Sequence, residues 1–135
     1  WFVGPRLGTS TFTGGIGFEI QRKAWGLNWG VRPNEEVIGL RYYFKPQVHS
    51  YFVGGFYHYF FRAQRVGFLR VRRENTENTL GVGGGRRWRW GSGWDLSLGL
   101  STAIEKRTVE SPSIGARIRR TELQLWLDFN FGYSF

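Results

Sequence analysis

The strongest constraint on the fold is the alternation of side chains in residues 123–135, LQLWLDFNFGYSF. Every second residue from Leu123 to Phe135 is apolar or aromatic, and the residues between them are mostly polar or small. A period of two is that of a β-strand with one apolar face. The thirteen residues reach roughly 43 Å at about 3.3 Å each, which is long for a globular strand but suits a tilted strand that crosses a bilayer of about 30 Å.

The same alternation recurs along the rest of the chain. It predicts eight strands, near residues 3–8, 16–21, 25–32, 38–45, 51–61, 80–90, 94–101 and 123–135. The segment 51–61 is aromatic on both faces, and there we place outward Val53, Gly55, Tyr57, Tyr59 and Phe61.

The links between these strands alternate in length. Short links are expected at residues 22–24, 45–50 and 91–93, and longer, more polar links at 12–15, 33–36, 62–76 and 105–120. All three short links fall on the side of the C-terminus, and short turns at one end with longer loops at the other are the outer-membrane arrangement. We therefore expect one all-β domain over residues 1–135, an eight-stranded antiparallel up-and-down transmembrane β-barrel.

Soluble barrels of the lipocalin or streptavidin kind also have eight strands. Such a barrel would direct its large apolar face inward, yet an eight-stranded lumen is only wide enough for side chains to fill it. Here the polar face carries charged residues and many of the 20 glycines, which fit a narrow lumen. The apolar face is therefore expected to face lipid, and the mean hydropathy of −0.37 averages two opposed faces.

Aromatic side chains gather near the short-turn end of the predicted strands, among them Trp90, Trp94 and Tyr133. Such rings are typical of an interfacial girdle. Arg86 breaks the pattern because it falls on the outward phase, where a lipid-facing charge costs about 2–4 kcal/mol at mid-depth. Three explanations stay open: snorkelling to the interface, packing against another protein, or a bulge that shifts the phase.

Charged residues on the inward phase must be paired if they are buried. We expect a connected lumenal network, with Glu105 as a further candidate, made of Arg6, Glu19, Arg41, His58, Arg87, Arg89, Asp95 and Asp128. A structural network that plugs the barrel is favoured over an ion path or a small polar ligand site, because the lumen has little free volume.

Catalytic and metal-binding signals are weak. The chain has no cysteine, which excludes disulfides and zinc–thiolate sites, and it has no nucleotide-binding, EF-hand or HExxH motif. We expect no metal and no cofactor. Two small outer-membrane barrels of this size are lipid A enzymes, and resemblance to the deacylase would need His-x-Ser, which neither His49 nor His58 matches. A non-enzyme is expected, with a lipid A-modifying enzyme or a narrow, porin-like channel as alternatives.

The formal charge of +9 comes from 19 basic and 10 acidic residues. The longer loops hold many of the arginines, which we expect to face lipopolysaccharide phosphates, since Arg binds phosphate in bidentate geometry. An ordinary solvated loop is the alternative. Nucleic-acid binding is not expected, because no recognition motif is present and the aromatic residues belong to the lipid face. The rim residues are Arg65, Arg70, Arg72, Arg73, Arg107, Arg117, Arg119 and Arg120.

The stretches GLRYYFKP and GVGGGRRWRWGSGWDLSLGL resemble strand–turn–strand units of outer-membrane β-barrel families, including those of Bacteroidetes-type bacteria. The whole chain resembles the small eight-stranded barrels of the OmpA/OmpX kind in Gram-negative outer membranes. The resemblance implies an outer-membrane location and a terminal signal for the barrel-assembly machinery at Phe131, Tyr133 and Phe135.

The resemblance also suggests a role and partners. We expect a structural or interaction role, as an accessory subunit of a larger outer-membrane complex, with lipid, lipopolysaccharide and other outer-membrane proteins as neighbours. A signal peptide removed upstream of Trp1 would fit this location, and trimming of a longer sequence would leave the same start. Fold alone does not determine function.

Overall fold

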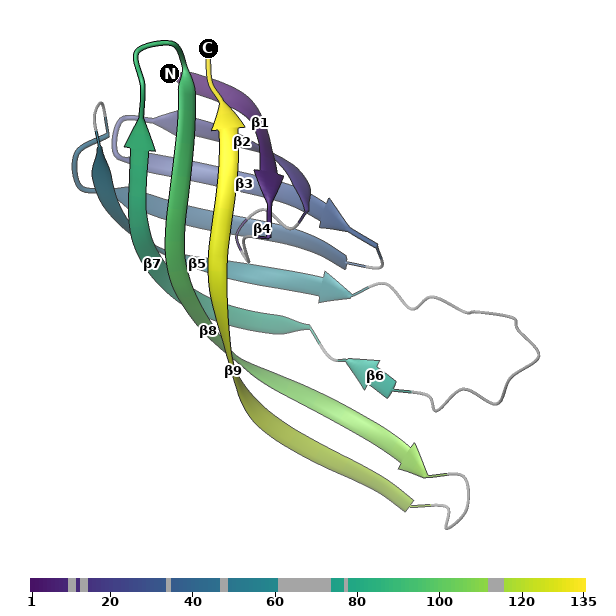
Figure 1. The fold of residues 1–135 in the computed structure, drawn as a ribbon. Coiled ribbons are helices and arrows are strands. Elements are labelled where there is room, and N and C mark those ends of the chain that lie inside the picture. The colour runs from purple at the N-terminus through teal and green to yellow at the C-terminus, as the bar shows by residue number, and fades with distance from the viewer. Residues whose placement is uncertain are drawn as a thin grey trace.

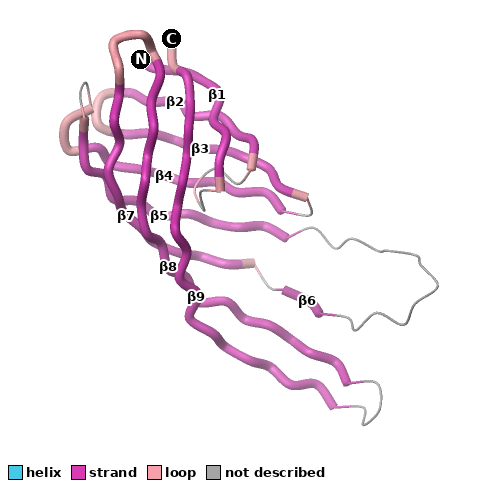
Figure 2. Tube along the Cα trace, viewed as in Figure 1, coloured by secondary structure: helices cyan, strands magenta, loops and turns pink. Residues whose placement is uncertain are grey.

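The computed structural model describes residues 1–9, 12, 15–33, 35–46, 49–60, 74–76, 78–111 and 116–135, and for 74–76, 106–111 and 116–120 the backbone alone. Every regular element in these ranges is a β-strand (Figure 2). The strands are β1 (Phe2–Gly8), β2 (Ile16–Arg22), β3 (Trp25–Arg32), β4 (Glu35–Tyr43), β5 (Ser50–Phe60), β6 (Glu74–Thr76), β7 (Thr79–Arg89), β8 (Trp94–Ser111) and β9 (Ala116–Tyr133).

The strands form one closed antiparallel sheet (Figure 1). From β1 to β5 and from β7 to β9 each strand pairs with the next along the chain, and β5 pairs with β7. The sheet closes where β1 pairs with β9 from Arg6↔Gly132 to Gly8↔Asn130. The short β6 pairs with β8 at Thr76↔Arg107, just beyond the last pair between β7 and β8, Leu80↔Ile104. Because β6 and β7 thus share one position beside β8, the wall has eight strand positions, which confirms the predicted eight-stranded barrel.

The short turns lie at the end of the barrel that holds both termini (Figure 1). The C-terminal segment lies against the β7–β8 turn, where the Ser134 amide donates to the Gly93 carbonyl at 2.8 Å, and against β1, where the Val3 amide donates to the Phe135 carbonyl at 3.2 Å. Gly93 has a φ of 90° in this turn, a conformation that favours glycine.

Two of the predicted links are partly strand. The prediction of a loop over residues 105–120 is wrong for most of that range, because β8 continues to Ser111 and β9 begins at Ala116. The two strands pair without interruption from Glu105↔Glu122 to Ser111↔Ala116. Residues 74–76 form β6 rather than the end of a loop. Backbone hydrogen bonds join these residue pairs, and such bonds do not require apolar residues to alternate with polar ones. The hydropathy pattern therefore did not reveal them.

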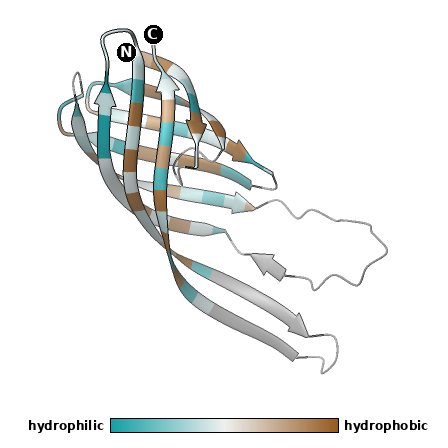
Figure 3. Ribbon diagram, in the orientation of Figure 1, coloured by the Kyte–Doolittle hydropathy of each residue, from teal (hydrophilic) through white to brown (hydrophobic). Residues whose placement is uncertain are grey.

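Most large apolar side chains of the strands face outward, as predicted, whereas Tyr43, Phe52 and Phe56 are buried in the lumen. Figure 3 shows apolar positions recurring along the strands of the wall, and alternate residues such as Leu123, Leu125 and Leu127 are more than 70% exposed. In β5 the outward phase holds Tyr51, Val53, Tyr57 and Tyr59, so the predicted phase is confirmed for the described part of 51–61. Nowhere in the described chain is there a helix long and apolar enough to cross a bilayer.

Arg86 lies on the outer wall. The register between β7 and β8 runs unbroken from Leu80↔Ile104 to Arg89↔Asp95, so no bulge shifts the phase at Arg86. Its side chain is exposed, as the outward phase predicts. The guanidinium carbon lies 5.5 Å from the ring centre of Tyr51 and 5.2 Å from that of Trp88.

Candidate functional site

The interior of the barrel is polar. Among the described side chains, four inward arginines are balanced by four buried carboxylates: Arg6, Arg41, Arg87 and Arg89 against Glu19, Asp95, Glu105 and Asp128. Equal numbers of opposite charges reduce the cost of removing each charge from water.

Arg6 is the centre of the network at the short-turn end. Its Nε donates to Glu19 Oε2 at 2.8 Å, its Nη1 lies 2.9 Å from Asp95 Oδ2, and its Nη2 donates to Ser134 Oγ at 3.0 Å. A Cβ on Gly132 would overlap the Arg6 guanidinium, so the glycine provides the space that Arg6 occupies. Because these partners come from β2, β8 and the C-terminal segment, Arg6 links the two sides of the β1–β9 closure.

Glu19 is the acceptor for several groups. The Tyr43 hydroxyl donates to Glu19 Oε1 at 2.7 Å, and Arg87 Nη1 lies 3.9 Å from the same oxygen. The Arg87 guanidinium lies 3.6 Å from the centre of the Tyr43 ring, a cation–π contact. Glu19 is 1% exposed, so its charge interacts with these cations with little screening by water.

Gln21 joins two of the arginines at the same end. Its Oε1 accepts from Arg87 Nη1 at 2.8 Å and from Arg89 Nη2 at 3.2 Å. The carbonyl of Pro46, in the β4–β5 turn, accepts from Arg87 Nη2 at 3.1 Å and from Arg89 Nη1 at 3.3 Å. The short turn is thereby tied to the lumenal network.

An aromatic layer fills the lumen next to this network. Phe12, from the link between β1 and β2, is fully buried, with ring centres 6.0 Å from Phe52 and 5.3 Å from Phe56. The Arg41 guanidinium lies over the Phe12 and Phe52 rings at 4.5 and 4.8 Å. At this level the described interior is occupied by three rings and a cation.

His58 lies apart from the Arg6 network. Its Nδ1 contacts Glu35 Oε1, and its ring centre lies 4.9 Å from that of Phe56 and 6.4 Å from that of Trp126. His58 is 3% exposed and contacts a carboxylate, so it is a hydrogen-bonding group of the core.

Ion pairs join five of the predicted lumenal residues directly: Arg6, Glu19, Arg87, Arg89 and Asp95. Arg41 is connected to them through a side-chain hydrogen bond with Tyr43, whose hydroxyl donates to Glu19. The Arg41 guanidinium also lies over the rings of the aromatic layer, His58 lies beside Glu35, and Asp128 is buried in the lumen at 2% exposure. Gln21, Tyr43 and Ser134 were not among the predicted residues, although their inward phase was a usable signal. Phe12 had no such signal, because it belongs to a link and not to an alternating strand.

The predicted basic rim cannot be placed by its side chains. Arg65, Arg70, Arg72 and Arg73 lie outside the described residues. Arg107 belongs to β8, and Arg117, Arg119 and Arg120 belong to β9, where only the backbone is described. The contact of these residues with lipopolysaccharide stays a prediction.

The residues of the expected assembly signal lie on the outer wall. Phe131, Tyr133 and Phe135 are 40%, 36% and 74% exposed. Trp94 stacks on Phe131 with ring centres 4.9 Å apart and meets Tyr133 edge to face at 5.0 Å. The group forms part of an aromatic surface beside the short turns.

In the ranges that the structure describes, no group of three or more His, Asp or Glu side chains could hold a metal ion. Comparisons with protein-family models, with curated proteins and with solved structures gave no match. The argument about function therefore depends on the geometry of the barrel.

Proposed function

We propose that the chain is an integral outer-membrane β-barrel with a structural or interaction role. The observation that carries the proposal is the inverted distribution of side chains in the described residues. Thirty large apolar side chains are exposed, whereas the buried set holds sixteen polar or charged residues and six hydrophobic ones. A barrel in water would expose its polar face, and an apolar surface of this extent is stable only against lipid or another apolar surface.

The height of the apolar surface also fits a membrane. The outward residues of the C-terminal strand extend from Leu123 to Phe135 and all are exposed. These positions span roughly 40 Å along the strand and, at a tilt of about 40°, roughly 30 Å across a bilayer. Rings of Trp90, Trp94 and Tyr133 lie at the short-turn end, where an interfacial girdle belongs.

The filled lumen favours a structural or interaction role over a channel. The aromatic layer of Phe12, Phe52 and Phe56 occupies the interior, and the Arg6 network occupies the short-turn end. With the interior filled, the outer wall and the loops are the surfaces available to partners. This supports a role as a subunit of a larger outer-membrane complex, which co-purification from native membranes would test.

A charge placed on the wall tests membrane insertion. Leu127 and Leu123 are both exposed on β9, at 71% and 76%, but Leu127 lies nearer the middle of the apolar band. In lipid vesicles, Leu127→Arg should lower the free energy of unfolding by about 2–4 kcal/mol and the matched Leu123→Arg by about 0–1 kcal/mol, because the cost depends on depth. Urea titration in vesicles measures both values.

A soluble barrel gives a different result. Both variants would then stay within about 0.5 kcal/mol of the wild type, as exposed substitutions do in water, and the protein would fold without lipid or detergent. Either finding contradicts the proposal. The two alternatives have their own assays: mass spectrometry of lipid A from expressing cells for an enzyme, and single-channel conductance for a channel.

A further inference from the structure

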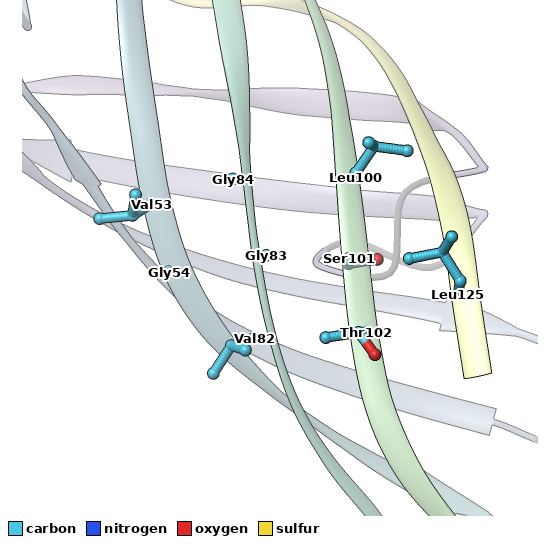
Figure 4. A pocket seen from close by; sticks show the side chains of 9 residues that line it. All are labelled: Val53, Gly54, Val82, Gly83, Gly84, Leu100, Ser101, Thr102 and Leu125. Carbon is cyan, nitrogen blue, oxygen red and sulfur yellow. The ribbon is translucent and has the colours of Figure 1, made fainter. Parts of the chain in front are cut away.

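The outer wall has an apolar groove where small residues interrupt the large ones. In one row across the strands, Gly84 of β7 pairs with Val53 of β5 and with Leu100 of β8. Gly84 has no side chain, so the wall is hollowed between its neighbours (Figure 4). The groove has a volume of about 600 Å³ and is also lined by Val82 and Leu125, and pockets that hold small ligands measure about 300–1,000 Å³.

A positive charge lies next to this groove. Arg86 faces outward on the same strand as Gly84, two residues nearer the short turns, which is roughly 6–7 Å along the strand. No ion pair in the described part of the chain includes Arg86. The side chain lies beside the rings of Tyr51 and Trp88, which leaves its guanidinium at the surface of the wall.

We propose that Arg86 and the groove at Gly84 bind an anionic glycerophospholipid, with the phosphate at Arg86 and an acyl chain along Gly84. The inference rests on the proposed membrane function. It assigns one amphiphilic ligand to two adjacent features of opposite character: a guanidinium, which pairs with phosphate oxygens, and an apolar hollow, which accepts hydrocarbon. It also accounts for an outward arginine without a partner protein.

The depth of Arg86 agrees with this assignment. Arg86 is four residues from Trp90, which directly follows the last residue of β7. Four residues correspond to roughly 10 Å in depth for a strand tilted by about 40°. A long arginine side chain at that depth reaches the headgroup region of the leaflet on the short-turn side. The groove lies on the side of Arg86 that is farther from the short turns, where the acyl chain of a lipid bound by its headgroup at Arg86 would lie.

Native mass spectrometry of the whole chain, folded in neutral detergent, tests the headgroup site. The protein is offered equal amounts of dioleoylphosphatidylglycerol and dioleoylphosphatidylcholine, which share their acyl chains. Both lipids carry a phosphate, but in phosphatidylcholine the choline ammonium group neutralises it. The wild type should therefore retain the anionic lipid in roughly tenfold preference, and Arg86→Gln, which removes the positive charge, should lose this preference. The matched control is Arg22→Gln, because Arg22 is also exposed and lies over an aromatic ring, that of Trp1.

A second pair of variants tests the groove. Val53→Trp places a large ring in the hollow and should reduce retention of both lipids several-fold, whereas Val31→Trp, at an outward position on β3, should leave it unchanged. Wild-type behaviour of Arg86→Gln or of Val53→Trp would overturn the proposal. So would a dimer in detergent that Val53→Trp abolishes, because the groove would then belong to a second copy. If instead the wild type fails to insert into vesicles, it is the proposed membrane function that is wrong.

Discussion

Removal of the Glu19 charge is the sharpest test of the lumenal network. Glu19 accepts from Arg6 at 2.8 Å and from Tyr43 at 2.7 Å, and it lies 3.9 Å from Arg87. Glu19→Gln keeps the shape of the side chain but leaves two buried guanidinium groups without this counter-charge. Breaking a buried ion pair from one side costs about 3–5 kcal/mol, and we expect the lower end because the amide oxygen still accepts from Arg6.

The assay is urea unfolding of the barrel in lipid vesicles, followed by tryptophan fluorescence. Glu122→Gln is the matched control, because Glu122 is exposed on β9, and it should change the free energy of unfolding by less than about 0.5 kcal/mol. A double-mutant cycle with Arg6→Met should show a coupling energy of about 0.5–3 kcal/mol, since Glu19 and Arg6 are in direct contact. A stability of Glu19→Gln equal to that of Glu122→Gln, or a coupling near zero, would refute the network as a stabilising element.

Two further predictions concern packing, and both are measured by the same unfolding assay. Phe12→Ala should lower the free energy of unfolding by about 3–5 kcal/mol, because Phe12 is fully buried among Phe52, Phe56 and Arg41. Phe12→Leu keeps most of the side-chain volume, so an equal loss of stability in that variant would contradict this reasoning. Gly85→Ala should cost about 1–3 kcal/mol, because its Cβ would overlap a backbone carbonyl of β8, whereas Gly91→Ala, which meets no atom within 4 Å, should be neutral.

The alternation of residues predicted most of the wall. Inward and outward positions follow from a period of two, which is a local property of a strand, so Leu127 could be placed outside and Glu19 inside without knowledge of the fold. The extension of β8 and β9 past Glu105 was missed, because the pairs from Glu105↔Glu122 onward are defined by backbone hydrogen bonds between two polar segments. Hydropathy carries no information about such pairs.

The site was predicted less completely than the wall. The inward phase identified Arg6, Glu19 and Asp95, but it could not say that Arg6 joins the other two, because they come from β2 and β8. The inward phase also placed His58 in the lumen, but it could not identify Glu35 of β4 as its partner. Which inward charges meet depends on the stagger between strands far apart in the sequence.

The sequence by itself determined which side of each strand faces outward and how many strands close the wall. Both follow from local periodicity and from the size of the residues on each face. Only the tertiary structure decided that Phe12 enters the lumen from a link, where the inward glycines Gly39 and Gly54 leave it room. It also placed Gly84 between Val53 and Leu100, which creates the groove beside Arg86. Register is a relation between strands, and no single segment contains it.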